Sequence, residues 1–109
     1  MPGQVLLTED AAYDLEDLYD HIAAHDSPRQ ADYVLDGMEK KLNDLLHFPE
    51  RGSIPSELDA FGIREYRQVI FKPYRMIYRV MDDKVYIYLI VDDRRDMQSV
   101  LARRLIRQR

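Results

Sequence analysis

The sequence predicts an α+β fold in which a helical hairpin packs on a mostly antiparallel sheet. Two observations predict this class. Two consecutive segments repeat apolar residues at the helical period, and three later segments are β-branched and aromatic runs joined by short turns. The expected order is β-α-α-β-β-β-α, in one domain over residues 1–109. With 46% hydrophobic and 33% charged residues, the chain can form one apolar core and is too short for two domains.

The first half of the chain is expected to form a strand and two helices. Residues 4–8 are an apolar run that ends at Thr8, which is suited to cap a helix. The helix after it carries an apolar stripe and is expected to end near residues 25–26. Ser27, followed by a proline, is a typical start for a second helix, which runs for about four turns to the break at residues 48–52. Two amphipathic helices joined by a tight turn predict a hairpin.

The second half is expected to form an antiparallel meander and a short terminal helix. Residues 52–62 are expected to be a loop, because they contain proline, glycine and scattered polar residues. Strands are expected at 66–71, 75–81 and 85–91, and the last helix at 97–109. The third strand is expected to lie in the centre of the sheet. Strict alternation would place four of its residues on one face: Val85, Ile87, Leu89 and Val91.

Composition excludes several classes of function. The chain has no cysteine, which excludes disulfides, thiol catalysis and cysteine-based metal sites. No run approaches the roughly 18 to 20 apolar residues of a membrane span, and no secretory signal is evident, so we expect a soluble cytoplasmic protein. His21 and His25 are spaced as two helical metal ligands would be, but a metal site also needs a third ligand and supporting groups. We therefore predict no metal and no cofactor.

The two halves of the chain carry opposite charge. Residues 1–62 hold 14 Asp and Glu against 4 Lys and Arg, whereas residues 63–109 hold 6 against 12. The halves could form one intramolecular interface or two surfaces for different partners. Arg75 and Arg79 would share an uncovered face of the second strand, where they would bind a partner's phosphate or carboxylate or pair with acids of this chain. The same alternatives apply to the arginines of the terminal helix: Arg103, Arg104, Arg107 and Arg109.

Two stretches of the chain resemble the ParE/RelE toxin superfamily. They read Pro-Tyr-Arg-Met-Ile-Tyr-Arg-Val at 73–80 and Val-Tyr-Ile-Tyr-Leu-Ile-Val-Asp-Asp-Arg-Arg-Asp-Met at 85–97. Leu-Ala-Arg-Arg-Leu at 101–105 is similar to the terminal helix of the ParE branch. The ordered set of pieces is more specific than any one of them, and the resemblance covers nearly the whole chain. It implies the toxin component of a type II toxin–antitoxin system.

The superfamily divides by target. RelE-type members cleave messenger RNA on the ribosome, which requires proton transfer and cations near the phosphate, whereas ParE-type members are taken to block DNA gyrase. By resemblance, Arg67, Arg75 and Arg94 match the basic positions of the ribonucleases. The matching place for the RelE tyrosine falls at Val100 or Leu101, neither of which can transfer a proton. Histidine-using relatives carry their histidine where this chain has only Asp92, Asp93 and Arg94, and arginine is a poor general base.

We therefore expect a gyrase inhibitor, not an enzyme, that is neutralised by a cognate ParD-like antitoxin. Neither a membrane partner nor sequence-specific nucleic-acid binding is expected. One alternative is a ribosome-dependent ribonuclease that uses the three arginines named above, and another is a toxin relic that only binds its antitoxin. Truncation after Met97 is expected to abolish growth inhibition. The residues expected to bind the target or the antitoxin are Arg75, Arg79, Arg94, Arg95, Asp96, Leu101, Arg104 and Leu105.

Overall fold

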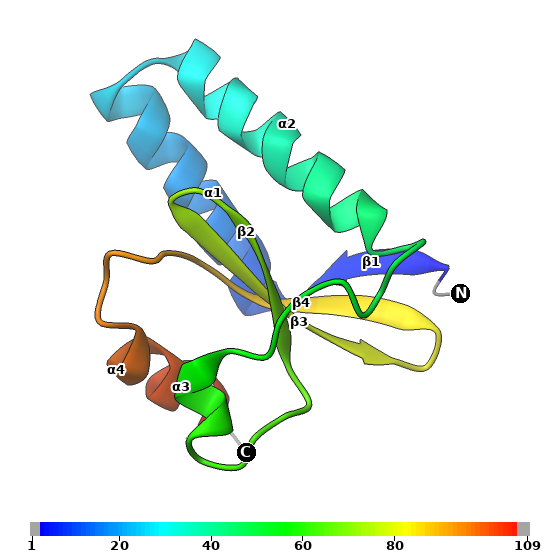
Figure 1. The fold of residues 1–109 in the computed structure, drawn as a ribbon. Helices are drawn as coiled ribbons and strands as arrows, with labels where there is room; N and C mark the ends of the chain where they lie inside the picture. Colours follow the sequence, from blue (N-terminus) through cyan, green and yellow to red (C-terminus); the bar gives the residue numbers. More distant parts are fainter. Residues whose placement is uncertain (1–2, 107–109) are drawn as a thin grey trace.

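The computed structural model of the chain describes residues 3–106 and has the predicted α+β architecture (Figure 1). The expected element order is confirmed, with one short helix in addition. The elements are β1 (Gln4–Leu7), α1 (Glu9–His25), α2 (Pro28–Asp44), α3 (Ser56–Asp59), β2 (Arg67–Phe71), β3 (Tyr74–Met81), β4 (Lys84–Asp92), α4 (Met97–Leu101) and the π-helical turn η1 (Ala102–Ile106).

The four strands form one mixed sheet in the order β1-β4-β3-β2. The hairpins β2–β3 and β3–β4 are antiparallel, as their short connections predicted, and β4 lies between β3 and β1. β1 pairs with β4 in parallel, with Leu7 opposite Ile87 at the end of the pairing. Because β1 is short, it covers only the first half of the outer edge of β4.

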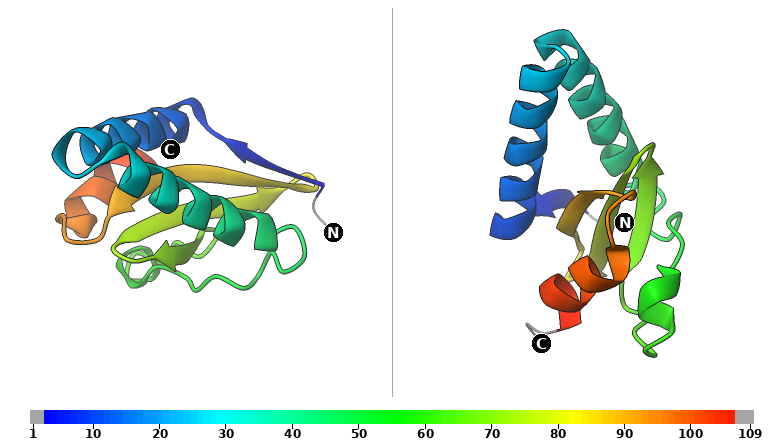
Figure 2. Two further views of the ribbon diagram at one scale, coloured as in Figure 1. Left: turned by 90° about the horizontal axis from the view of Figure 1, so that it is seen from above. Right: turned by 90° about the vertical axis from the view of Figure 1, so that its left-hand side faces the viewer.

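The helical hairpin α1–α2 is built by the two caps that the sequence indicated. The Thr8 hydroxyl accepts a hydrogen bond from the backbone of Ala11 at 3.1 Å, and Ser27 Oγ accepts one from Gln30 at 3.0 Å. Both helices pack on one face of the sheet (Figure 2). This first core contains 14 buried residues, among them Ala11, Ile22, Ala31, Val34, Met38, Leu42, Leu45, Met76, Tyr78, Val85 and Ile87.

The opposite face of the sheet is also covered at one end, which corrects the expectation of an uncovered face. A second core packs there between the sheet, α3, α4 and η1, and α3 and α4 contact each other (Figure 2). The prediction of a plain loop over 52–62 is wrong for the same reason. Leu58 is fully buried, so Ser56–Asp59 closes into a helical turn over this core. The other buried members are Tyr66, Ile77, Leu89, Val91, Met97, Val100, Leu101 and Leu105.

A β-bulge in β4 overturns the predicted alternation of its side chains. The register with β3 shifts between Ile77, which lies opposite Leu89, and Tyr78, which lies opposite Ile87. Tyr88 is therefore the extra residue of β4, and the side chains after it change face. Val85 and Ile87 pack in the first core, whereas Leu89 and Val91 pack in the second. The sequence could not show this, because every residue from 85 to 91 is apolar or aromatic.

Candidate target-binding surface

The terminal segment, defined here as residues 97–106 of α4 and η1, carries three of the residues that the sequence singled out for target or antitoxin binding, Leu101, Arg104 and Leu105. Asp96 is its N-cap: the carboxylate accepts hydrogen bonds from Ser99 N at 3.3 Å and from Ser99 Oγ at 2.7 Å. These hydrogen bonds hold the pKa of Asp96 below its usual value. In this structure Asp96 therefore starts the helix, and a contact with a partner remains a prediction.

The apolar residues of the terminal segment face inward. Leu101 and Leu105 are 1% and 5% exposed and lie in the second core beside Leu89. The sequence analysis proposed them as partner-binding residues. In this structure their side chains are not accessible, and their contacts instead attach the segment to the sheet.

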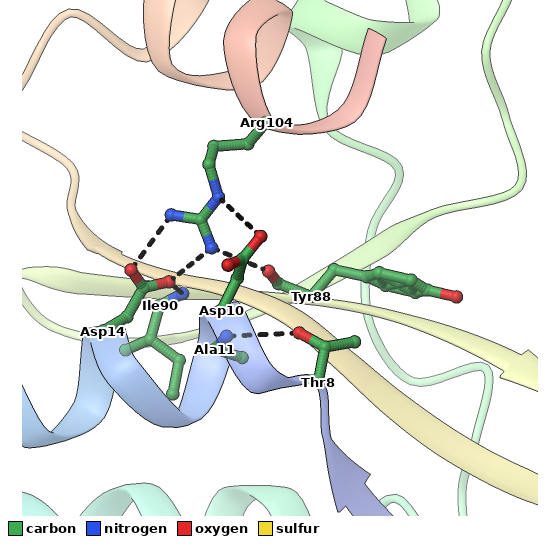
Figure 3. A network of polar contacts seen from close by, with 7 residues as sticks. All are labelled: Thr8, Asp10, Ala11, Asp14, Tyr88, Ile90 and Arg104. Atoms are coloured by element: carbon green, nitrogen blue, oxygen red, sulfur yellow. Dashed lines mark hydrogen bonds and ion pairs between the residues drawn. The ribbon is translucent and has the colours of Figure 1, made fainter. Parts of the chain in front are cut away.

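Arg104 attaches the terminal segment to α1 (Figure 3). Its Nη1 and Nη2 atoms each donate to one carboxylate oxygen of Asp14 at 2.9 Å, and Nη2 also donates to the carbonyl oxygen of Tyr88 at 3.2 Å. Asp10 lies 3.9 Å from Nε at the rim of the same cluster. The Arg104 and Asp14 side chains are only 18% and 19% exposed, so this bidentate pair is far better shielded than a surface ion pair.

The cluster lies where the outer edge of β4 loses its neighbouring strand. The pairing of β1 ends at Leu7, and Thr8 N then donates to the carbonyl of Ile87 at 3.0 Å. Beyond that point, Asp14 Oδ2 accepts from the backbone N–H of Ile90 at 3.1 Å, while Arg104 donates to the carbonyl of Tyr88. These two side chains thus bond backbone groups that a longer β1 would have paired, next to the bulge.

A groove between α1 and the end of β4 continues from this cluster. Asp17 and His21 line one wall, and Arg94 and Arg95 line the other. The Arg94 guanidinium pairs with Asp92 and is the main reason that the pKa of the Asp92 carboxyl lies below its usual value. Arg95 and Arg103 are exposed, and within residues 3–106 neither side chain forms an ion pair.

Arg75 is engaged inside the chain. Its guanidinium forms a bidentate pair with Glu57 at 2.9 Å for both contacts, and Nε donates to Gln68 Oε1 at 2.7 Å. Arg75 is 7% exposed, and its hydrogen bonds lower the pKa of Glu57. Of the two alternatives for this arginine, the structure favours pairing with an acid of the same chain. Each of its three nitrogens donates a hydrogen bond within the chain, and a role in partner binding remains a prediction.

Arg79 and Arg67 are also held by neighbouring groups. Arg79 lies 3.9 Å from the carboxylate of Glu65 and 6.0 Å from the centre of the Tyr66 ring. Arg67 Nη1 donates to the backbone carbonyl of Gly52 at 2.8 Å. These three contacts keep both arginine side chains beside groups of the same chain.

The three arginines of the ribonuclease alternative do not converge. Arg75 shares a sheet face with Gln68, so Arg67, the residue before Gln68, projects to the opposite face. Arg94 lies two residues beyond the end of β4, whereas Arg67 lies at the register of Ile87 near the middle of that strand. A phosphate could not contact all three arginines in this arrangement.

Tyrosines near these arginines are poor candidates for proton transfer. The Tyr78 hydroxyl donates to the carbonyl of Pro49 at 2.7 Å and accepts from Gly52 N at 3.1 Å. Burial raises its pKa, and burial also raises the pKa of Tyr88. Val100 and Leu101, which occupy the place of the RelE tyrosine, are buried in the second core.

Sequence reasoning missed the acids that organise this surface. Asp14 and Glu57 were not singled out, although the opposite charge of the two halves of the chain was the available signal. One of the alternatives for the terminal arginines, pairing with acids of this chain, is what Arg104 does, and its partner Asp14 lies on the acidic first helix. Arg107 and Arg109 lie outside the described residues.

Between residues 3 and 106, no cluster of three or more His, Asp or Glu is arranged to bind a metal, and no helix has the length and apolarity of a membrane span.

Comparison with known proteins establishes first the fold of this chain and then its family. A solved structure titled "Chromosomal ParDE TA system from P. aeruginosa" matches with a TM-score of 0.68 and 19% sequence identity, over 84% of this chain and 96% of that one. The likeness establishes a shared fold. A search of curated proteins finds no match. The family model described as "ParE toxin of type II toxin-antitoxin system, parDE" matches residues 5–97, and the chain belongs to this family of type II toxins.

Proposed function

We propose that this toxin inhibits DNA gyrase by binding it directly, through the terminal segment and the exposed arginines beside it. The observation that carries the proposal is that Arg104 attaches this segment to α1 and β4, while Arg95 and Arg103 stay exposed and unpaired among residues 3–106. Cations on an ordered element can bind acidic groups of a partner without first breaking ion pairs of their own.

The competing ribonuclease function has less support. Arg67, Arg75 and Arg94 lie on different faces and at different ends of the sheet, and each is engaged with a neighbouring group. Tyr78 and Tyr88 have raised pKa values, so their hydroxyls stay protonated at neutral pH and are poorly suited to accept a proton. A binding mechanism requires none of these groups to act as an acid or base.

The partner that restrains the toxin is, in this proposal, a ParD-like antitoxin. Two facts support it: the family is defined by toxins of the parDE type, and the solved relative is titled as a ParDE system. Because gyrase is an intracellular enzyme, the same proposal places the toxin in the cytoplasm.

The direct test is DNA supercoiling by purified gyrase with increasing amounts of the purified toxin, beside a messenger-cleavage assay on programmed ribosomes. Loss of supercoiling or trapped cleaved DNA, with messenger intact, is the expected result. Cleaved messenger with normal supercoiling would overturn the proposal and would indicate that Arg67, Arg75 and Arg94 serve in catalysis.

Charge reversal on the exposed arginines tests the surface itself. Arg103→Glu and Arg95→Glu are expected to raise the toxin concentration for half-inhibition at least about tenfold, since an interfacial contact with a charged group is worth about 1.5–3 kcal/mol. Arg29→Glu is the matched control, because Arg29 is exposed at the start of α2, away from this surface. Equal inhibition by all three variants would exclude the terminal segment as the gyrase-binding surface. Thermal unfolding should be nearly unchanged in each.

A further inference from the structure

The terminal segment is held by two kinds of contact that differ in how well they define its orientation. Leu101 and Leu105 bury apolar surface in the second core, and such contacts are non-directional. Among the described residues, and apart from the cap formed by Asp96 and Ser99, Arg104 makes every polar side-chain contact from this segment to the rest of the fold. A bidentate pair between a guanidinium and a carboxylate is directional, so Arg104 defines the orientation that the apolar contacts leave free.

Asp14 is suited to receive this contact. It lies near the middle of the first half of α1, and its Oδ2 also accepts from the backbone of Ile90 in β4. Its carboxylate is therefore connected to α1, to the central strand and to the terminal segment at once (Figure 3). Asp10, which precedes it by one helical turn, is 60% exposed and lies 3.9 Å from Arg104.

Orienting Arg104 also orients the residue beside it. Arg103 is exposed, whereas Arg104 points into the cluster with α1 and β4. In a helical turn, the directions of successive side chains are related by a fixed rotation, so fixing the direction of one fixes that of the next. From this geometry we infer that Asp14 is a positioning residue for target binding: through Arg104 it holds the terminal segment so that Arg103 faces the partner. This inference rests on the proposed function.

The test compares Asp14→Asn with Asp10→Asn, two variants with the same change of charge on the same helix. The asparagine oxygen at position 14 can still accept from Ile90, so the substitution weakens mainly the contact with Arg104. Asp14→Asn is expected to raise the concentration for half-inhibition of gyrase supercoiling at least about tenfold, and Asp10→Asn less than about twofold. Hydrogen exchange should speed up in residues 97–106 of Asp14→Asn and stay unchanged in α2 and β3.

A second substitution separates positioning from general stability. If Asp14 acts through Arg104, Asp14→Asn should add little to the loss of inhibition already caused by Arg104→Gln, and Arg104→Lys should recover part of it. Exchange that speeds up throughout the fold, or unchanged inhibition by Asp14→Asn, would overturn the inference. If the unsubstituted toxin leaves supercoiling intact, the proposed function fails instead, so the two failures are distinguishable.

Discussion

Arg75 illustrates why a charged residue cannot be assigned to a surface from its strand position alone. Its alternation with apolar neighbours was compatible with a solvent-facing cation. The structure instead buries it between Gln68 of β2 and Glu57 of α3, with hydrogen bonds to both. An arginine with good bidentate geometry can be buried because the carboxylate offsets much of its desolvation cost. Arg75 thereby joins α3 to the sheet.

Removing one partner of this pair should be costly. Arg75→Ala leaves Glu57 half-buried without its cation, and we expect the free energy of unfolding to fall by about 2–4 kcal/mol. Arg64→Ala is the matched control, because the Arg64–Asp59 pair is as close at 2.7 Å but both side chains are at least 47% exposed. Its expected change is within about 0.5 kcal/mol. Urea denaturation measures both, and equal effects would show that burial does not decide the value of the pair.

The same pair makes stability depend on pH. Arg75 holds the pKa of Glu57 below its ordinary value of 4.5, so this carboxyl protonates at higher pH in the unfolded chain than in the folded one. The contribution of this ion pair to the free energy of unfolding is complete above the pKa that Glu57 has in the unfolded chain. That contribution is lost as the pH falls through the pKa that Glu57 has in the folded chain. Urea midpoints measured from pH 7 to pH 3 should therefore fall less steeply for Glu57→Gln than for the unsubstituted chain. Asp92 and Asp96, whose pKa values are also lowered, will maintain part of the slope in both.

At the scale of single elements, the turn between β3 and β4 places two aspartates in a backbone conformation that is unfavourable for them. Met81 and Lys84 pair directly, so Asp82 and Asp83 form a two-residue turn with φ angles of 51° and 64°. This left-handed conformation is the one that such hairpin turns require, and glycine adopts it more readily than aspartate. The turn also places two negative charges side by side.

Asp83→Gly is expected to stabilise the toxin by about 0.5–1 kcal/mol, because it removes the steric cost at φ 64°. The same exchange at Asp36, an exposed position inside α2, should destabilise by about 0.5–1 kcal/mol. Thermal unfolding of the two variants should therefore shift in opposite directions. Destabilisation by both would mean that the Asp83 side chain makes a contribution that outweighs its backbone strain.

At the scale of the whole molecule, the terminal segment is part of the fold. It supplies Met97, Val100, Leu101 and Leu105 to the second core, and Arg104 joins it to α1, whose sequence lies at the other end of the chain. The acidic first half and the arginine-rich second half therefore meet inside the toxin, through Asp14–Arg104 and Glu57–Arg75. Among residues 63–106, Arg95 and Arg103 are exposed and without an ion pair, and so remain accessible to a partner.

Truncation after Met97 should consequently damage the fold as well as the activity. It exposes Ile77 and Leu89, which are at most 1% exposed, and removes three buried side chains, so we expect a loss above about 4 kcal/mol. Circular dichroism with a thermal scan is the measurement. A truncated chain that unfolds like the full one would show that the second core is dispensable. Charge reversal at Arg103 is therefore the better probe of target binding.

The elements and their order could be predicted from the sequence, because helix caps, apolar period and turn residues are local signals. Thr8 and Ser27 cap as expected, and the hydrophobic runs of the second half form the predicted meander. Which charged side chains are paired and which are exposed could not be predicted and became evident from the packing of the folded chain. The bulge at Tyr88 and the covered second face depend on contacts between separate elements. The ion pairs of Arg75 with Glu57 and of Arg104 with Asp14 join residues 18 or more positions apart in the chain. Such pairings depend on burial and distance, which no local pattern encodes.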